Sequence, residues 1–337
     1  MILQNKYVIG CLVMFYEIEM LQEYIDSIVG ALREVENPDN VTIVIDFSFQ
    51  EYLETIDTEV ITMRDIFDKF HDAIAELEKI VDVNVSIYNT ENDFYNIAQH
   101  RRDLNDGWCQ HVDFVIWGET DSLFPAETFD AIEAISRQAS EDNVNRYIIN
   151  FADRKNWDAS WDVITHPMFE KIDYVDEVSW LTTNEASSKS YMSYQRMCEI
   201  NNLADSYDIK ALYEPKFDGS CLVISSELIK SGVNIPLAVT HCAEDTSFGK
   251  MAKLVCGQKY IQFVVKNILR VHNRRHPRKR MYIKNENNPM GFVGKSKGDW
   301  WNILEYTSKY NVDRLFNSQE KFKSLDDILS EIKKLRL

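Results

Sequence analysis

Glycine and proline are scarce in this chain of 337 residues, which contains 11 Gly and 7 Pro. Apolar residues make up 45% of it, and these figures together exclude a disordered, collagenous or low-complexity protein. No apolar run reaches the roughly 18 residues that a membrane-spanning helix needs, so we expect no integral membrane segment. The apolar N-terminal run lacks the small-residue cleavage site of a signal peptide, and we expect it to be a buried strand.

Several familiar motifs are also missing. The six cysteines form no C-x-x-C pair and most lie in apolar runs, which is typical of reduced thiols, so we expect a cytoplasmic protein. The motifs G-x-G-x-x-G, H-E-x-x-H and G-x-S-x-G are absent. Gly294-Lys295-Ser296 resembles the end of a phosphate-binding P-loop, but Pro289 stands where the first glycine of that loop would be.

Basic residues are outnumbered, because 37 Lys+Arg stand against 54 Asp+Glu and the net charge is −17. This balance argues against a protein that coats nucleic acid or an anionic membrane over its whole surface. Residues 270–284 are the exception, with seven basic residues and no acid. We call them the basic segment. Such a run is usually a solvated face, but after a strand it can also bind phosphate groups.

Apolar periodicity predicts alternating strands and helices in the first half of the chain. Continuous apolar runs predict buried strands, and apolar residues spaced three or four apart predict helices. The predicted strands are 7–15, 41–46, 83–88, 112–117 and 147–151, and helices are predicted around 21–32, 66–81, 96–104 and 129–135. This alternation predicts an α/β fold with a mostly parallel, doubly wound sheet flanked by helices. In such sheets ligands bind at the carboxyl ends of the strands.

The second half of the chain is predicted to be less regular. We expect an insertion at about 152–215, where Trp157, Trp161 and Trp180 could stack on sugars or bases. Strands are predicted again at 220–225 and 260–265. We expect a catalytic domain over 1–285 and a helical C-terminal extension over 286–337.

Two pairs of acids lie where chemistry is expected. Glu119 and Asp121 follow the predicted strand 112–117, and hard carboxylate oxygens at a strand end suit Mg²⁺ or Mn²⁺. Acids in a turn before a helix are common without any metal, so that alternative stays open. Glu244 and Asp245 open a predicted helix, where crowding can raise a carboxyl pKa and create a general base. The alternative for this pair is a helix cap.

Two further candidates are associated with predicted strands, since Asp46 ends the strand 41–46 and His272 follows the strand 260–265. Asp46 could hydrogen-bond a nucleobase or ribose, or cap the segment that follows. His272 could bind a metal-bound diphosphate together with the arginines that follow it, Arg274, Arg275 and Arg278.

In this order along the chain, the motifs resemble those of the GT-A fold glycosyltransferases, especially the family 2-like ones. The resemblance covers roughly residues 6–280. It implies that Asp46 contacts the nucleotide base of the donor and that the stretch 95–102, with Arg101 and Arg102, contributes to donor binding.

The same resemblance assigns the metal and the base. Glu119-Thr120-Asp121 stands in the place of the D-x-D motif, which implies that Asp121 binds Mn²⁺ or Mg²⁺ with Glu119 nearby. His272 completes the metal site. The Glu244-Asp245 pair supplies the catalytic base of inverting members, and Asp245 is the residue implied.

These assignments imply metal-dependent transfer of a hexosyl or pentosyl group from a nucleotide-diphosphate donor, which we expect to be a UDP-sugar, to an acceptor hydroxyl with inversion. The acceptor stays open between a glycan and a hydroxymethylated base in DNA, as for phage-type DNA glycosyltransferases. A non-catalytic module that binds a sugar nucleotide or a glycan is a further alternative. A nucleotidyltransferase is disfavoured, because no glycine-rich loop follows the first predicted strand.

Overall fold

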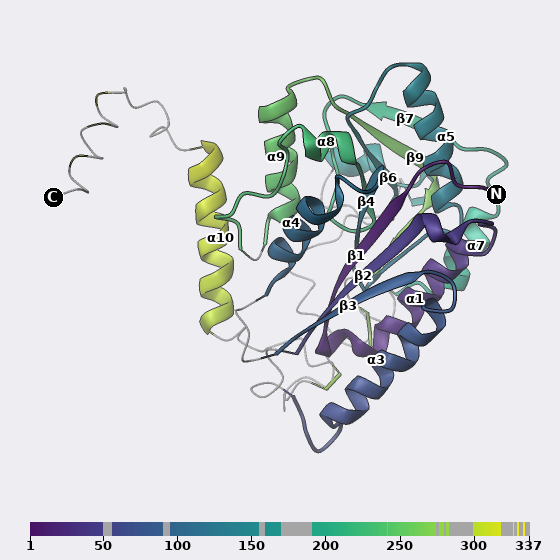
Figure 1. Cartoon of the computed structure of the whole chain (residues 1–337), viewed down its shortest axis with the longest axis vertical. Coiled ribbons are helices and arrows are strands. Elements are labelled where there is room, and N and C mark those ends of the chain that lie inside the picture. Colours follow the sequence, from purple (N-terminus) through teal and green to yellow (C-terminus); the bar gives the residue numbers. More distant parts are fainter. Residues whose placement is uncertain are drawn as a thin grey trace.

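The computed structural model describes residues 1–49, 56–89, 95–154, 159–169, 191–240, 242–273, 276–279, 281–282 and 299–317, with residues 326, 329 and 333. Its centre is an eight-stranded sheet in the order β3-β2-β1-β4-β8-β6-β9-β7 (Figure 1). The strands are β1 (Tyr7–Met14), β2 (Val41–Ser48), β3 (Asp82–Tyr88), β4 (Phe114–Gly118), β6 (Tyr147–Ala152), β7 (Ile209–Leu212), β8 (Leu222–Ser225) and β9 (Ile261–Leu269).

Most strands of this sheet run in the same direction. β1 pairs in parallel with β2 and β4, β2 pairs in parallel with β3, and β6 pairs in parallel with β9. β8 lies antiparallel between β4 and β6, and β7 is an antiparallel edge strand beside β9. The predicted α/β class with a mostly parallel sheet is therefore confirmed.

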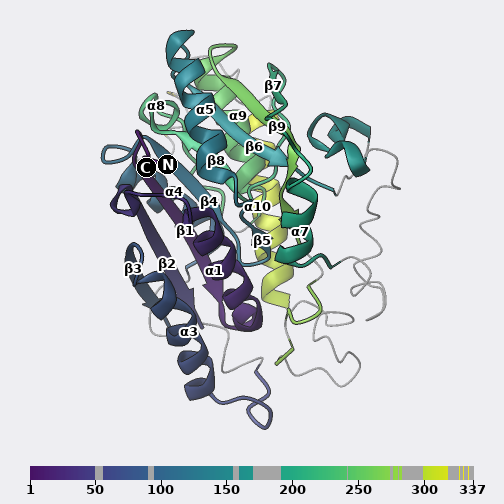
Figure 2. The same cartoon turned by 90° about the vertical axis from the view of Figure 1, so that its right-hand side faces the viewer.

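Helices cover both faces of the sheet, which is why its central strands β1 and β4 carry no charged or strongly polar residue. One face packs against α1 (Ile18–Leu32), α3 (Met63–Leu77) and α5 (Thr128–Glu141), and Figure 2 shows α1 and α3 running along β1 and β2. The other face packs against α4 (Ile97–Trp108), α8 (Ser226–Lys230) and α9 (Glu244–Cys256). Helix α10 (Asp299–Asn317) lies beside α9 in Figure 1, and its Val312 joins the same apolar cluster.

A second, two-stranded sheet connects distant parts of the chain. β5 (Ser122–Leu123) follows β4, and β10 (Val271–His272) follows β9 after one residue. The two strands pair antiparallel, with His272 opposite Ser122. This short ladder brings His272 to the carboxyl end of β4.

One predicted strand boundary differs from the structure. The strand predicted to end at Asp46 continues to Ser48, because Phe47 and Ser48 are buried and remain paired with both β1 and β3. Several short elements lie within the range 152–215 of the predicted insertion. Its first described part holds the short 3-10 helices η3 (Ala159–Ile164) and η4 (Pro167–Phe169), and its second part holds α7 (Tyr194–Asn201) and the edge strand β7 of the main sheet.

Other expectations fall partly outside the described residues. Trp157 and Trp180 lie outside the described residues. Trp161 is described, and the Lys216 ammonium lies over its ring, 4.8 Å from the centroid. Helix α10 lies within the range 286–337 of the predicted extension. Two further short 3-10 helices, η1 (Phe15–Glu17) and η2 (Pro38–Asn40), complete the described elements. None of the helices in the described ranges combines the length and apolar character needed to cross a bilayer.

Candidate functional site

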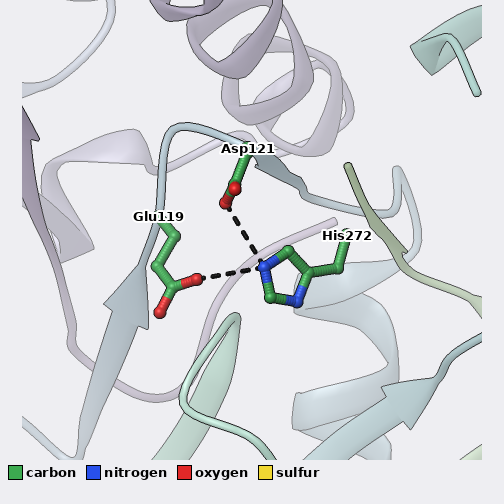
Figure 3. A group of neighbouring side chains, drawn as sticks. All are labelled: Glu119, Asp121 and His272. Atoms are coloured by element: carbon green, nitrogen blue, oxygen red, sulfur yellow. Dashed lines mark ion pairs between the residues drawn. The ribbon is translucent and has the colours of Figure 1, made fainter. Parts of the chain in front are cut away.

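Three predicted metal ligands meet at the carboxyl end of β4. Glu119 and Asp121 follow the last residue of β4, and the β5–β10 ladder brings His272 to them. The Nε2 atom of His272 lies 3.3 Å from Oε2 of Glu119 and 3.4 Å from Oδ1 of Asp121. Figure 3 shows both carboxylates pointing at this one ring nitrogen. The backbone N–H of Asn273 donates to the carbonyl of Asp121 (2.6 Å) and holds the two segments together.

The donor set of this cluster suits a divalent ion. One ligand atom from each of Glu119, Asp121 and His272 lies within 4.8 Å of the other two. Two carboxylates and an imidazole are ligands that Mn²⁺ accepts, and carboxylates suit Mg²⁺. Burial opposes ionisation of Asp121, but Lys279 and His272 hold its pKa well below the usual range. Asp121 is therefore an anion at neutral pH, as a metal ligand must be.

The other ring nitrogen of His272 faces two residues that the sequence did not identify. Nδ1 lies 3.1 Å from Ser220 Oγ and 3.4 Å from Asp218 Oδ2. Asp218 is itself fixed, because it accepts hydrogen bonds from the N–H and hydroxyl of Ser220 (3.1 and 2.8 Å). This pair orients the imidazole so that Nε2 points at Glu119 and Asp121.

Arg270, the first residue of the basic segment, is buried and neutralised. Its guanidinium donates to Asp153 (2.6 Å) and Asp218 (2.7 Å) and is 2% exposed. Although burial opposes ionisation of Asp218, Arg270 and His272 lower its pKa well below the usual range. Arg270 therefore belongs to the interior beneath the candidate site and adds nothing to an exposed basic face.

Arg101 joins the metal-ligand cluster to the acidic pair on α9. This side chain is fully buried and donates to Glu119, to Glu244 Oε1 (2.5 Å) and to the carbonyl of Gly219 (2.8 Å). Its guanidinium also lies 4.8 Å from the ring centroid of Trp117 on β4. Burial disfavours the charge, but the surrounding carboxylates, Glu119 first, raise the pKa of Arg101. Arg101 is thus a permanent cation between two acids from different elements.

Glu244 and Asp245 open α9 and differ in their surroundings. Ala243, just before the helix, has φ of 62°, a strained backbone conformation for a non-glycine residue. Glu244 is buried, and that burial raises its pKa to about 7 despite Arg101. Asp245 is half-buried and accepts a hydrogen bond from the backbone N–H of Thr246 (2.5 Å). Burial raises the pKa of Asp245 as well. Asp245 is therefore the more accessible carboxylate of the pair.

Lys279 is also in the basic segment, and its side chain points toward the metal-ligand cluster. Its ammonium lies 2.9 Å from Asp121 Oδ2 and 3.1 Å from Glu17 Oε1. Glu17 comes at the end of η1, directly after β1, and accepts a hydrogen bond from the Thr120 hydroxyl (2.9 Å). Arg278 is exposed beside it. Of the other predicted diphosphate ligands, Arg274 and Arg275 lie outside the described residues.

The remaining two predicted donor contacts lie in different environments. Asp46 is buried, accepts a hydrogen bond from the Tyr95 hydroxyl (3.1 Å) and lies 2.6 Å from His100 Nδ1. The Tyr95 ring stacks on Tyr88, with the centroids 4.0 Å apart. Arg102 points away from the cluster and donates to the carbonyls of three loop residues, Ile235, Pro236 and Val239. These bonds indicate that Arg102 holds the loop between α8 and α9.

Asp218, Glu17 and Lys279 were not predicted as site residues from the sequence. A signal existed for Glu17, because it follows the central strand β1 at the edge where ligands bind in such sheets. Asp218 stands in an Asp-Gly-Ser segment just before β8. Lys279 was one of seven basic residues in one segment, and nothing in the sequence separated it from the others.

Comparisons with known proteins add a likeness of fold. No family model matches the sequence, and no curated protein is significantly similar to it. Among solved structures, the chain is similar to S. aureus TarS 1–349 (11% identity, 78% of this chain and 58% of that chain, TM-score 0.43). It is also similar to TarS 1–349 in complex with UDP-GlcNAc (13%, 96% and 77%, 0.40) and to UDP-glucose pyrophosphorylase complexed with UDP-glucose (7%, 90% and 98%, 0.33).

These neighbours concern the arrangement of the backbone. The chain spans 58% and 36% of the length of the first two TarS structures that it matches. The mostly parallel sheet flanked by helices agrees with the GT-A-like fold that the sequence resembles.

Proposed function

We propose that this chain is a glycosyltransferase that takes a sugar from a nucleotide-diphosphate donor and transfers it to an acceptor hydroxyl. The observation that carries the proposal is the connected cluster at the sheet edge. Glu119, Asp121 and His272 form a metal-type donor set, and Arg101 links that set to the start of α9. A cation site for a diphosphate and a carboxylate for a general base are thus joined in one site.

In this proposal Asp121, Glu119 and His272 hold Mn²⁺ or Mg²⁺. The bound ion would offset the charge that develops on the departing diphosphate. The exposed Arg278 binds diphosphate oxygens, and Arg274 and Arg275 are proposed to do the same. We propose UDP as the nucleotide, with the base near Asp46 and the stacked Tyr88 and Tyr95.

The proposed general base is Asp245, which accepts the proton of the acceptor hydroxyl. The acceptor oxygen attacks the anomeric carbon on the face opposite the diphosphate, so a hexosyl or pentosyl group is transferred with inversion. Glu244 and Arg101 do not touch the acceptor in this scheme. Their ion pair holds the first turn of α9 in place.

The proposed catalytic domain comprises residues 1–285, followed by the extension 286–337. Helix α10 of the extension contacts the loop before α9, because the Ser308 hydroxyl donates to the carbonyl of Cys242 (2.7 Å) and Asn311 donates to the carbonyl of Ala238 (2.8 Å). We propose that the protein acts in the cytoplasm, which is supported by its six free cysteines. Within the described ranges, no contact favours a DNA base as the acceptor. No contact there favours a non-catalytic module that only binds a sugar nucleotide or a glycan.

The test compares UDP release from a panel of UDP-sugars, with and without Mn²⁺, for the wild type and two variants. Asp121→Asn removes the proposed metal ligand, and Asp245→Asn removes the proposed base. Both should lose turnover, while Asp245→Asn should keep the thermal stabilisation by UDP and Mn²⁺ that reports binding.

The matched control is Asp113→Asn. Asp113 is an exposed acid at the other end of β4, where it accepts a hydrogen bond from the N–H of Lys6 (2.8 Å), and it should keep wild-type turnover. Equal metal-dependent rates for Asp121→Asn and the wild type would contradict the metal site. The absence of stabilisation by any nucleoside diphosphate would contradict the function as a whole.

A further inference from the structure

Lys279 holds a position that a divalent cation would be expected to take. Its ammonium lies between two carboxylates, 2.9 Å from Asp121 Oδ2 and 3.1 Å from Glu17 Oε1. The side chain is 17% exposed. A lysine is ordinarily protonated, and two carboxylates on either side favour its ammonium form.

The two oxygens of Asp121 are divided between two partners. Oδ1 lies 3.4 Å from His272 Nε2, and Oδ2 lies beside Lys279. A divalent ion on Asp121 would therefore lie within a few ångströms of a second positive charge. Like charges at that separation repel strongly in a partly buried site, so the ammonium and the ion compete for the same carboxylate.

Backbone hydrogen bonds hold the turn that carries Lys279, and the side chain of Lys279 is long. The N–H of Lys279 donates to the carbonyl of His276 (3.0 Å), whose own N–H donates to the carbonyl of Asn273 (2.8 Å). The ring of His276 is buried, with Nε2 3.6 Å from Glu23 Oε2 on α1. The four-carbon stem of a lysine can reorient without any movement of this turn.

We propose that Lys279 is the resident counter-cation of Asp121, and that a divalent ion gains Asp121 by displacing this ammonium, which then binds the donor's diphosphate. This inference rests on the proposed function, because it assumes that the cluster binds a divalent ion and a diphosphate. It assigns Lys279 two opposite effects, since the residue weakens binding of the metal alone and strengthens binding of the nucleotide.

The experiment measures Mn²⁺ binding to the full chain by the loss of the free-ion paramagnetic resonance signal. The variants are Lys279→Gln, which removes the charge, and Lys279→Arg, which keeps it. Without nucleotide, Lys279→Gln should bind Mn²⁺ about tenfold more tightly than the wild type, and at saturating Mn²⁺ it should bind UDP about tenfold more weakly. Lys279→Arg should stay close to the wild type in both. A lysine that only supported the fold would weaken both affinities when replaced, and that result would overturn the inference.

A measurement on the wild type tests the inference even if the Lys279 variants fail to fold. Mg²⁺ should increase reductive methylation of Lys279, read by mass spectrometry, because the displaced ammonium becomes accessible. Unchanged or reduced labelling would overturn the inference.

The variant Asp121→Asn distinguishes a failure of the proposed metal site from a failure of the inference about Lys279. If it binds Mn²⁺ as the wild type does, the proposed metal site fails and the inference fails with it. If it loses Mn²⁺ while Lys279→Gln gains no affinity, the metal site stands and the inference alone is wrong.

Discussion

Arg101 and Glu244 form an ion pair of 2.5 Å, from Nη1 to Oε1, that joins α4 to the first residue of α9. The same guanidinium binds Glu119 beside the metal-type cluster. Neither bond was predicted, because Arg101 was expected to contact the donor directly. The structure places it beneath the candidate site as the cation that the two acids share.

Replacing Arg101 should therefore affect both stability and binding. Arg101→Met leaves two carboxylates without their buried partner, which should lower the free energy of unfolding by about 3–5 kcal/mol. Urea denaturation measures this loss, and the thermal shift with UDP and Mn²⁺ should disappear. Arg102→Met is the matched control from the next position of α4. It removes three bonds to loop carbonyls and should lower stability while retaining the UDP shift. The same loss of the UDP shift in both variants would argue against a special role for Arg101.

Gly219 lies against the Arg101 guanidinium with no room for a side chain. A Cβ atom at Gly219 would lie 2.1 Å from Arg101 Nη1, so Gly219→Ala must displace that group. We expect turnover to fall at least about tenfold, because a displacement near 1 Å in positioning residues is costly. Gly107→Ala is the control, since its Cβ would meet nothing within 4 Å, and in α4 it should stabilise by about 0.5–1 kcal/mol. Unchanged turnover in Gly219→Ala would show that the position of Arg101 does not matter.

Asp218 and Asp153 allow the orientation of His272 to be tested separately from stability. Both acids pair with Arg270, but Asp218 also lies 3.4 Å from His272 Nδ1. Asp218→Asn should weaken Mn²⁺ binding by about 10–100-fold, the usual effect of losing a carboxylate that orients a metal-binding histidine. Asp153→Asn should destabilise the fold with a smaller effect on Mn²⁺ affinity. Calorimetric titration measures both, and equal metal affinities in the two variants would contradict the orienting role.

Glu244 should make stability depend on pH. Burial raises its pKa from 4.5 to about 7, so between these values the folded chain holds a proton that the unfolded chain has released. The stability that this group contributes is complete below about pH 4.5 and is lost as pH rises through about 7, by about 3 kcal/mol. Glu244→Gln lacks this loss. The difference in urea stability between variant and wild type should therefore move in favour of the variant from pH 5 to pH 8, and a constant difference would show that Glu244 has an ordinary pKa.

Much of the fold could be predicted because the sheet is covered on both faces. A strand such as β1 must then be apolar at every position, and this leaves a continuous run in the sequence. The end of β2 was placed too early, since Asp46 looked like a strand end. Asp46 is buried inside the strand with His100 and Tyr95 as partners, and only tertiary contacts supply them.

The candidate site was predicted less completely, for reasons of geometry. Glu119, Asp121 and His272 were expected together, and the structure brings them together. Arg101 and Arg102 could not be distinguished in the sequence, yet successive residues of a helix point about 100° apart, so one faces the cluster and the other a loop. From the sequence, the seven basic residues of the basic segment were expected to form a single group of charges. Arg270 and Lys279 instead turn inward to acids from distant elements, which local sequence does not reveal.

Arg270 also determines which way His272 points. It is the one residue between β9 and β10, and its N–H donates to the carbonyl of Ala152 (2.7 Å) while its guanidinium is held by two buried acids. Side chains alternate between the two faces of a strand, so adding or removing one residue here would turn the imidazole to the opposite side. The length of this connection therefore determines which side of β10 the His272 imidazole faces. Any change in it should abolish metal binding in a protein whose main sheet is intact.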